Sequence, residues 1–343
     1  MAVSFVINTS GGEPLYKQLL QQFESKIKTG KLKSGDMVPS MNDLANQLNV
    51  SRETIKKVYS ILRDRGYLEP RQGKGFYVKE QNSLRNLSIL ILFDKLSIYK
   101  QTILNSFLAE VGDGIETTFL IFNQNLDLLE YYLDLYLDQF DYYLVTPHCP
   151  LDEKSQKRML KIISRIPNRK LIVLDVLPKN LRGYFGAVYQ DFENDAYDGL
   201  AEGLDKIKII GRLKVITLPT SLYGKQVIKA VDRFCEENGI VAMYYDAPPK
   251  KIYKNDIFLL ISSQLDTGIA ELNDNVISNN LTIGKDVFLI SYNEFDLNKV
   301  VLGGLTTIST DFAKMGRLAA KMVKEKKLFK QKCDFGMTRR MTF

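Results

Sequence analysis

The chain has 343 residues, of which 45% are hydrophobic and 25% are charged. This composition excludes a mostly disordered chain, and the length predicts two or three folding units rather than one hydrophobic core. The sequence has no run of about 18 apolar residues, so we expect no transmembrane helix. Its start lacks the basic and apolar regions of a signal peptide. With three widely spaced cysteines, this favours a cytoplasmic protein with free thiols.

The net charge of +7 is concentrated near the N-terminus. Residues 1–85 contain 14 Lys and Arg against 8 Asp and Glu, a net of +6, whereas residues 86–343 contain 33 against 32, a net of +1. A small basic unit beside a large neutral one suggests a nucleic-acid-binding module joined to another domain. A basic face that only keeps the protein in solution would give the same counts, so the residues themselves must decide.

The first predicted element is a helix with one buried face. Apolar residues recur at every fourth position from Leu15 to Ile27, which is typical of an amphipathic helix. Pro14 is tolerated at a first helical position, where no N–H is needed. Gly30 can adopt the left-handed geometry that ends a helix.

Two further helices are predicted around a tight turn. Ser40 is a good N-cap for a short helix, and Asp43 adds negative charge to its first turn. Residues 49–50 form the turn, and Ser51 caps a third, longer helix. The buried stripe of this third helix is expected to consist of Ile55, Val58, Tyr59 and Leu62.

Two short strands are predicted to follow these helices. Gly66 ends the third helix, and residues 67–68 and 76–78 read as strands around a basic, glycine-rich tip at residues 69–75. Three helices and a hairpin make a winged helix-turn-helix, an α+β fold. The third helix of such a unit presents its N-terminal residues to base edges in the major groove. The glycines of the tip allow close approach to phosphates, where Lys74 would neutralise charge.

Residues 14–78 resemble the winged helix of the GntR family from end to end. The shared features are Pro-Ser before the second helix, Val-Ser-Arg-x-Thr at the start of the third helix, and Gly-Lys-Gly in the wing. The family usually has Glu-Arg after Pro-Ser, and that Arg touches DNA, whereas this chain has Met41 and Asn42. Each candidate contact could instead be a capping or solvated surface residue, and for the two capping serines both roles can hold. The DNA contacts predicted from the resemblance and the geometry together are Ser40, Asn42, Ser51, Arg52, Thr54, Lys56, Lys57, Gly73, Lys74 and Gly75.

The rest of the chain is predicted to be a two-lobed α/β domain with parallel sheets. We expect domain boundaries at 1–79 and 87–343, with a polar linker at 80–86. Short apolar runs alternate with amphipathic segments, which indicates helices on both faces of parallel sheets, and about 255 residues suit two lobes. The predicted strands are Leu87–Phe93, Thr118–Phe122, Tyr142–Val145, Leu171–Leu174, Ala187–Tyr189, Leu213–Leu218, Val241–Tyr245, Ile257–Ile261 and Val287–Ile290.

Polar residues follow several of these strands. Asp94, His148, Asp175 and residues 190–191 each come after a predicted strand, and residues 291–294 follow the last one. Ligands of such folds bind beyond the carboxyl ends of the strands, so two facing lobes would collect these groups in one cleft. Carboxylates, amides and aromatic rings suit a ligand with many hydroxyls. Taken singly, each of these polar residues could merely cap the next helix.

Several segments of this large domain resemble the effector domain of LacI-type regulators, which is similar to periplasmic binding proteins. Residues 287–323 resemble its closing portion, with Asn293 and Glu294 at its two acidic positions, the first of which usually contacts sugar. Asp191 and Asp266 match two further polar positions, and Lys225 or Gln226 lies near the position of the usual sugar-contacting Arg. The ligand-binding residues predicted on this basis are Asp94, Tyr99, His148, Asp191, Lys225, Asp266, Tyr292, Asn293 and Glu294.

The sequence offers little support for catalysis. His148 is the single histidine, so a catalytic triad would need it, and the side chain of its neighbour Cys149 should point to the opposite face of an extended segment. No zinc-ligand spacing and no phosphate-binding glycine loop is present. We therefore predict no catalytic residue, no metal and no cofactor.

The leading prediction is a homodimeric transcription regulator, expected to be a repressor, that binds a double-stranded DNA operator. Its operator affinity would be controlled by a monosaccharide bound between the lobes, and the pairing of domains resembles arabinose-responsive regulators. One alternative is a pyridoxal-phosphate-dependent enzyme-like regulator, because GntR-type heads also occur on aminotransferase-like bodies. Another is a sugar-binding protein without a regulatory role.

Overall fold

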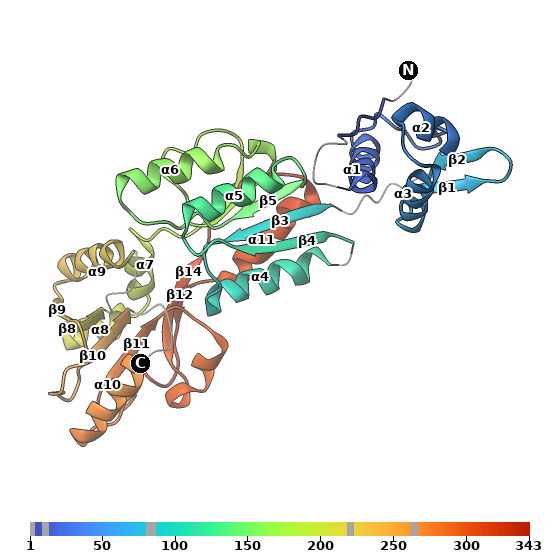
Figure 1. The fold of residues 1–343 in the computed structure, drawn as a ribbon. Coiled ribbons are helices and arrows are strands. Elements are labelled where there is room, and N and C mark those ends of the chain that lie inside the picture. The colour runs from blue at the N-terminus through green and yellow to red at the C-terminus, as the bar shows by residue number, and fades with distance from the viewer. Residues whose placement is uncertain (1–3, 9–13, 80–86, 113, 218–222, 262–266) are drawn as a thin grey trace. The chain divides into compact units, whose positions relative to one another are not determined.

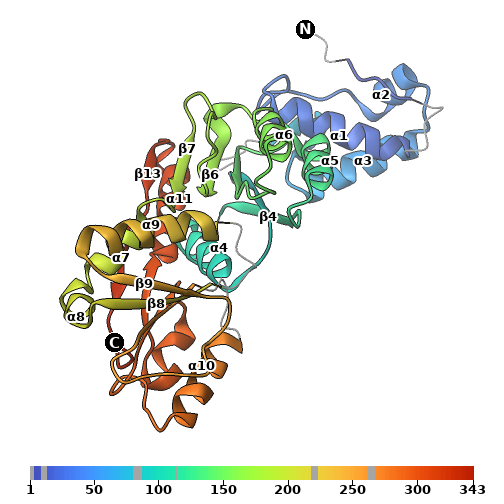
Figure 2. The ribbon, with the colours of Figure 1, turned by 90° about the vertical axis from the view of Figure 1, so that its left-hand side faces the viewer.

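The structure, a computed structural model, describes residues 4–8, 14–79, 87–112, 114–217, 223–261 and 267–343. The chain forms two compact units, Met1–Arg85 and Asn86–Phe343, which are described separately (Figures 1 and 2). The predicted linker at 80–86 lies outside the described residues.

The first unit is a winged helix-turn-helix, as predicted. Its β-strands pair antiparallel, with Leu68 opposite Val78 and Arg71 opposite Gly75. The hairpin tip is shorter than predicted, because the first strand continues through Pro70. Proline fits there because β2 also bridges Met37 on its other side, which leaves Pro70 on an edge strand where no N–H is required. The elements are α1 (Leu15–Lys28), α2 (Met41–Leu48), α3 (Arg52–Asp64), β1 (Leu68–Arg71) and β2 (Gly75–Val78).

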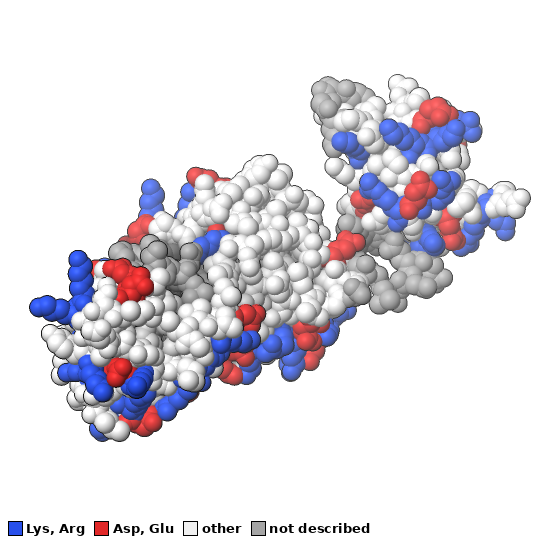
Figure 3. All heavy atoms as spheres, turned by 90° about the horizontal axis from the view of Figure 1, so that it is seen from below, with Lys and Arg blue, Asp and Glu red and all other residues white. Residues whose placement is uncertain are grey.

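The core of this unit is built on α3. The four residues predicted for its buried stripe are all inaccessible to solvent. The ring of Tyr59 meets Phe23 of α1 and Phe76 of β2 edge to face, and its hydroxyl donates a hydrogen bond to the Pro39 carbonyl at 2.7 Å. These contacts fix α3 against the other elements. On the face drawn in Figure 3, Lys and Arg cover more of this unit than Asp and Glu do.

The first lobe of the large unit is a six-stranded parallel sheet between two layers of helices. The strand order is β13-β7-β6-β5-β3-β4. Helices α4 and α11 bury their apolar residues on one face, and α5 and α6 bury theirs on the other. The strands are β3 (Ser88–Phe93), β4 (Glu116–Ile121), β5 (Tyr142–Val145), β6 (Leu171–Asp175), β7 (Gly186–Tyr189) and β13 (Lys330–Lys332). The helices are α4 (Ile98–Val111), α5 (Leu126–Tyr136), α6 (Glu153–Ile163), the 3-10 turn η1 (Asn168–Lys170) and α11 (Phe312–Glu325).

The second lobe repeats this architecture. Its strand order is β14-β12-β11-β10-β8-β9, and all neighbours are parallel except β14, which runs antiparallel to β12. Helices α7, α8 and α9 cover one face, and α10 covers the other (Figure 2). The strands are β8 (Arg212–Thr217), β9 (Val241–Tyr245), β10 (Ile257–Ile261), β11 (Phe288–Tyr292), β12 (Thr306–Thr310) and β14 (Phe335–Thr338). The helices are α7 (Asp195–Ala201), α8 (Leu204–Ile210), α9 (Gly224–Asn238), α10 (Thr267–Ser278), η2 (Asp296–Lys299) and η3 (Val301–Gly303).

The chain passes between the lobes three times. It crosses from β7 to α7, from β12 to α11 and from β13 to β14. The crossovers bond to one another: Asp311 N donates to Asp334 O at 3.0 Å, and Thr310 Oγ1 donates to Gln190 Oε1 at 2.8 Å. The two-lobed fold with parallel sheets is therefore as predicted. In the described ranges, every helix is too short or too polar to cross a bilayer.

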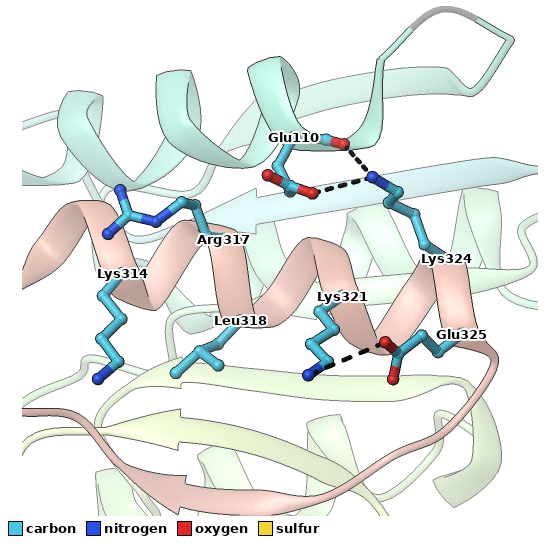
Figure 4. A pocket seen from close by; sticks show the side chains of 7 residues that line it. All are labelled: Glu110, Lys314, Arg317, Leu318, Lys321, Lys324 and Glu325. Atoms are coloured by element: carbon cyan, nitrogen blue, oxygen red, sulfur yellow. Dashed lines mark hydrogen bonds and ion pairs between the residues drawn. The ribbon is translucent and has the colours of Figure 1, made fainter.

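Helices α4 and α11 approach each other closely in the first lobe. A Cβ added at Gly316 of α11 would lie 2.3 Å from the Ile103 carbonyl oxygen and 2.9 Å from the Phe107 nitrogen of α4. Lys324 also ties the helices together, because its ammonium donates to the carboxylate of Glu110 at 2.9 Å and to its carbonyl at 3.0 Å (Figure 4). Since the atoms beside Gly316 belong to backbone, they cannot rotate away.

We expect Gly316→Ala to destabilise the large unit by about 1–3 kcal/mol, because the added methyl forces the two helices apart. Urea unfolding followed by circular dichroism would measure the change in the free energy of unfolding. The control is Arg317→Ala at the next, exposed position, where a change within about 0.5 kcal/mol is expected. Equal stability of the wild type and Gly316→Ala would show that the helices tolerate a wider separation.

Candidate functional site

The predicted DNA-binding face begins at the two capping serines. Ser40 accepts a hydrogen bond from the Asp43 N–H at 3.1 Å, and Ser51 accepts one from the Thr54 N–H at 3.2 Å. Their hydroxyls also bond to the side chains of those same residues, at 2.6 and 2.8 Å. Both serines are exposed, so their capping role is present, and a contact to phosphate remains a prediction.

The basic residues of α3 differ in their surroundings. Arg52 is exposed in the first turn, where a recognition helix meets base edges. Lys56 forms an exposed ion pair with Glu53 at 3.6 Å, which DNA phosphates can readily replace. Lys57 lies over the Tyr16 ring at 4.0 Å, so its ammonium is turned toward α1. Asn42 is exposed on α2.

The wing is a short turn that glycine makes possible. Gly73 and Gly75 have φ values of 74° and 100°, in the left-handed region that other residues rarely adopt. Lys74 between them is exposed at the tip. Arg71, which the sequence analysis did not select, is also exposed and lies over the Tyr77 ring at 4.5 Å. It pairs with Glu69 at 3.1 Å and places a second cationic side chain beside the tip.

In the large unit, polar groups that follow separate strands meet in a buried network. We use this name for Asp94, Lys100, His148, Asp175 and Gln190, which the structure buries. The Lys100 ammonium bonds to the Asp94 carboxylate and lies 3.6 Å from Asp175 Oδ2. Thr146 Oγ1 donates to Asp94 Oδ1 at 2.8 Å, and Gln124 Nε2 donates to Asp94 Oδ2 at 3.3 Å. Asp94 is therefore a fully paired carboxylate.

Asp175 is the centre of this network. Its Oδ2 lies 2.7 Å from His148 Nε2, and its Oδ1 accepts a hydrogen bond from Gln190 Nε2. Burial alone would raise the pKa of Asp175, but His148 and Lys100 hold it well below its usual range. Through Gln190, the network continues to Thr310 at the second crossover. It therefore joins the end of β6 to two of the three crossovers.

Aromatic rings surround the network. Tyr223, directly before α9, stacks on Phe192 with ring centroids 4.4 Å apart and meets the His148 ring edge to face at 5.3 Å. Tyr99 packs on Phe312 at 4.8 Å. Burial raises the phenol pKa of both tyrosines, and the negative charge of Asp175 raises it further. Tyr292 behaves in the same way, with Asp195 and Asp175 as the nearby charges, so all three phenols remain protonated donors.

A pocket of about 700 Å³ opens beside the network. Its lining residues lie within 151–160, 176–180 and 189–193, together with Tyr223 and Gln226. Gln190 belongs both to the pocket wall and to the network, and Tyr223 reaches from the wall to His148. The pocket therefore lies beyond the carboxyl ends of β6 and β7, the edge where α/β folds bind ligands. Its size is that of a small-molecule site.

The nine predicted ligand-binding residues are not all brought together. Asp94, Tyr99 and His148 lie in or against the network, and Asp191 lines the pocket, where it accepts a hydrogen bond from Asn194 Nδ2 at 2.6 Å. Lys225 is exposed on α9, and the pocket wall is formed by its neighbours instead.

The remaining predicted residues follow β10 and β11. Tyr292 is buried close to Asp175, and Asn293 beside it is buried with φ at 76°. Glu294 is held by Arg340 at 2.7 Å and lines a separate pocket of about 460 Å³. Asp266 lies outside the described residues.

Some residues of the site escaped the sequence analysis. Lys100 was not selected because it occurs within an amphipathic helix, and a lysine there is normally solvated. Tyr223 and Phe192 carry no spacing signal of their own. Asp175 and Gln190 follow predicted strands, and this position is the signal that points to them. A polar residue directly after a strand is thus the sequence feature that indicates this site, and it applies to Asp175 and Gln190 as well as to those of the nine predicted residues that follow strands.

The cysteines have no catalytic setting. All three are unpaired and buried, and burial raises the thiol pKa to about 11 for Cys149 and Cys235 and to about 12 for Cys333. Cys149 accepts a hydrogen bond from Gln156 Nε2 at 3.2 Å, whereas His148 bonds to Asp175. The two neighbours therefore have different hydrogen-bond partners. No cluster of metal-ligating side chains occurs in the described part of the chain.

Comparison with known proteins identifies the first unit. Residues 15–78 match the family described as "Bacterial regulatory proteins, gntR family". Over 85 residues the chain is 35% identical to the mannosyl-D-glycerate transport/metabolism system repressor MngR of Escherichia coli (strain K12), and 32% identical to the arabinose metabolism transcriptional repressor of Geobacillus stearothermophilus. These matches cover 25% and 23% of this chain, but only 35% and 23% of the relatives. The chain is therefore matched over about a third or less of their length.

Solved structures share the fold of the large unit. The trehalose repressor from Escherichia coli has a TM-score of 0.58 and 14% identity, over 74% of this chain and 100% of the other. The lac repressor dimer bound to operator and the anti-inducer ONPF has a TM-score of 0.55 and 14% identity, over 88% and 94% of the two chains. The chain thus carries a gntR-type helix-turn-helix domain, and its large unit has the two-lobed fold of the lac and trehalose repressors.

Proposed function

We propose that this protein is a transcription regulator that represses its target by binding an operator as a homodimer, and that a monosaccharide in the large unit controls this binding. The observation that carries the proposal is the joining of a gntR-type winged helix to a two-lobed fold with a polar, aromatic-lined pocket at its strand ends. Two relatives that match the winged helix are named as repressors of sugar metabolism. Such a regulator acts in the cytoplasm, on DNA.

The DNA contacts would come from the exposed residues of α2, α3 and the wing. In a dimer, each protomer places one α3 in a major-groove half-site, and the two half-sites are related by two-fold symmetry. The lac repressor of similar fold was solved as a dimer on its operator, which supports the same assembly here. The predicted contacts of the exposed Ser40 and Asn42, of the half-buried Thr54 and of the other predicted positions remain part of this proposal.

The pocket chemistry suits a sugar. Asp191 and Gln190 offer oxygens to hydroxyl groups, and the rings of Phe192 and Tyr223 can cover an apolar sugar face. Because Gln190 also bonds to Thr310 at a crossover, a ligand that engages this wall can change the relation of the two lobes. Thermodynamic coupling is reciprocal, so the sugar weakens operator binding by the same factor that the operator weakens sugar binding.

A thermal-shift panel of pentoses and hexoses tests the effector. A sugar at about 100 times its dissociation constant should stabilise the folded state by about 2.7 kcal/mol, which raises the melting temperature measurably. The sugar that shifts the melting temperature should also lower operator affinity in a fluorescence-anisotropy titration. A sugar that binds without altering operator affinity would support a sugar-binding protein with no regulatory role.

The enzyme alternative makes a different prediction. A pyridoxal-phosphate-dependent protein has a visible absorption band from the imine formed with its lysine, so an absorption spectrum of the purified protein separates the two proposals. We expect no such band. Its appearance after addition of pyridoxal phosphate, together with loss on borohydride treatment, would favour the enzyme-like alternative.

A further inference from the structure

The buried network carries no excess positive charge. Asp94 and Asp175 face the single ammonium of Lys100, which already contacts both carboxylates. With a neutral His148 imidazole the network has a net charge of −1, and with a protonated imidazole it is neutral. An anionic ligand beside this network would therefore find no unpaired cation, and it would meet carboxylates at short range.

The pocket rim also carries no excess positive charge. Its two lysines each form an exposed ion pair with a rim carboxylate, Lys157 with Glu153 at 2.5 Å and Lys179 with Glu193 at 3.4 Å, so the charges of the lysines are balanced on the rim, although a ligand could replace either partner. Asp191 adds a third carboxylate, and no arginine is among the described residues that line the pocket.

Neighbouring parts of the chain do not reverse this excess of carboxylates over lysines. Lys95 is half-buried and directly follows Asp94. When it is added to the charged residues of the pocket rim and the buried network, four lysines stand against five carboxylates. The segments 218–222 and 262–266, which follow β8 and β10 in the chain, contain no Lys or Arg. The N-terminus of α9 supplies only about half a positive charge.

Near the pocket and Asp175, the buried side-chain atoms of the described residues that lack a hydrogen-bond partner are oxygens. No hydrogen-bond partner from the described residues reaches Gln226 Oε1 in the pocket wall or Tyr292 Oη near Asp175, and the same holds for Asn293 Oδ1 beside it. An unpaired buried polar atom is costly, so a ligand that satisfies it gains affinity. Sugar hydroxyls can donate to oxygens, whereas ionised phosphate and carboxylate oxygens only accept. The two amide oxygens, Gln226 Oε1 and Asn293 Oδ1, therefore favour hydroxyl donors, whereas the protonated Tyr292 phenol can either donate or accept.

From these charges and acceptors we propose that the pocket takes an uncharged, hydroxyl-rich ligand and excludes phosphorylated sugars and sugar acids. The inference rests on the proposed function, because it assumes that a sugar binds at this site. It adds the chemical class of that sugar: a free saccharide rather than an intracellular sugar phosphate. The regulator would then respond to the sugar before the first phosphorylation step.

Matched pairs of ligands test this inference on the full-length protein. The probes are D-ribose with ribose 5-phosphate, D-arabinose with arabinose 5-phosphate, D-glucose with glucose 6-phosphate and gluconate, and D-fructose with fructose 6-phosphate. Melting temperatures are measured with each, followed by calorimetric titration of any pair that gives a shift. We expect at least one free sugar to bind, and its anionic partner to bind at least about tenfold more weakly, or 1.4 kcal/mol.

The outcomes separate the inference from the proposed function. A phosphorylated or acidic sugar that binds as tightly as its free partner, or more tightly, overturns the inference and leaves the sugar effector in place. A panel in which no sugar of either kind binds contradicts the sugar effector itself. Asp175→Asn should reduce the ratio between the dissociation constants of the anionic sugar and its free partner by at least about threefold, because the substitution removes one carboxylate. Asp274→Asn, the same change at an exposed position of α10, should leave it unchanged.

Discussion

Lys100→Met should destabilise the large unit by about 3–5 kcal/mol, the largest effect we expect from a single substitution in this protein. The side chains of Lys100, Asp94 and Asp175 are all fully buried, and the ammonium contacts both carboxylates. Methionine keeps the length of the side chain but leaves the two carboxylates without their cation in a region of low dielectric constant. Urea unfolding monitored by circular dichroism, analysed for the transition of the large unit, gives the change in the free energy of unfolding.

The matched control is Lys321→Met on the exposed face of α11. Lys321 pairs with Glu325 at 3.9 Å (Figure 4), and both side chains are more than half exposed, so a change below about 0.5 kcal/mol is expected. The double variant Lys100→Met/Asp94→Asn should recover part of the loss, because it removes one of the two stranded carboxylates. Similar stability for Lys100→Met and Lys321→Met would show that the buried pairing contributes little.

The same network predicts how stability depends on pH. The pKa of Asp175 is lowered in the folded protein, so the unfolded state binds its proton more readily. Its stabilisation is therefore complete above the unfolded pKa of about 4, and it is lost as the pH falls toward the lowered folded value. Asp175→Asn should remove this part of the acid sensitivity, which unfolding measured between about pH 3 and pH 7 would reveal.

Arg52→Ala should weaken operator binding by about 1–3 kcal/mol for each half-site and leave sugar binding unchanged. Arg52 is exposed in the first turn of α3, beyond the Ser51 cap, so its loss removes a base-edge or phosphate contact without disturbing the core. The preferred duplex is first selected from a random library with the wild-type protein. Fluorescence anisotropy then measures the affinity of each variant for that duplex and for an unrelated one.

The control for this prediction is Arg63→Ala, three turns further along the same helix. Arg63 pairs with Asp64 at 2.9 Å. Its loss should weaken binding to the selected and the unrelated duplex by the same factor, and by less than Arg52→Ala weakens binding to the selected duplex, because only a general attraction to phosphates is lost. Arg52→Ala should instead reduce the preference for the selected duplex. Unchanged operator affinity in Arg52→Ala would reject the placement of α3 in the major groove.

The first unit could be predicted almost completely from the sequence, because its signals are local. Ser40 and Ser51 cap the helices that they precede, Asn49 adopts the left-handed turn between them at φ 50°, and Gly30 has the positive φ expected after α1. Cap, turn and periodicity each involve residues within a few positions of one another. The exception is the length of β1, which pairs with β2 as far as Arg71 opposite Gly75.

The alternation of apolar runs and helices was also enough to predict the two-lobed α/β domain. It could not predict which polar side chains meet. Lys100 reads as an ordinary helical lysine until β3 and β6 bring Asp94 and Asp175 to the same edge of the sheet. Nor could it predict that Glu294 pairs with Arg340, 46 residues away in sequence.

The sequence by itself therefore determined the class of each unit and the basic character of the first. Only the tertiary structure decided how the pocket is composed, including the contact of Tyr223 with His148 across 75 positions of the chain. The physical reason is that caps and periodicity reflect the backbone within one or two turns. The partner of a buried charge depends instead on which strand ends the sheet order places side by side, and on which side chains the packing directs toward that edge.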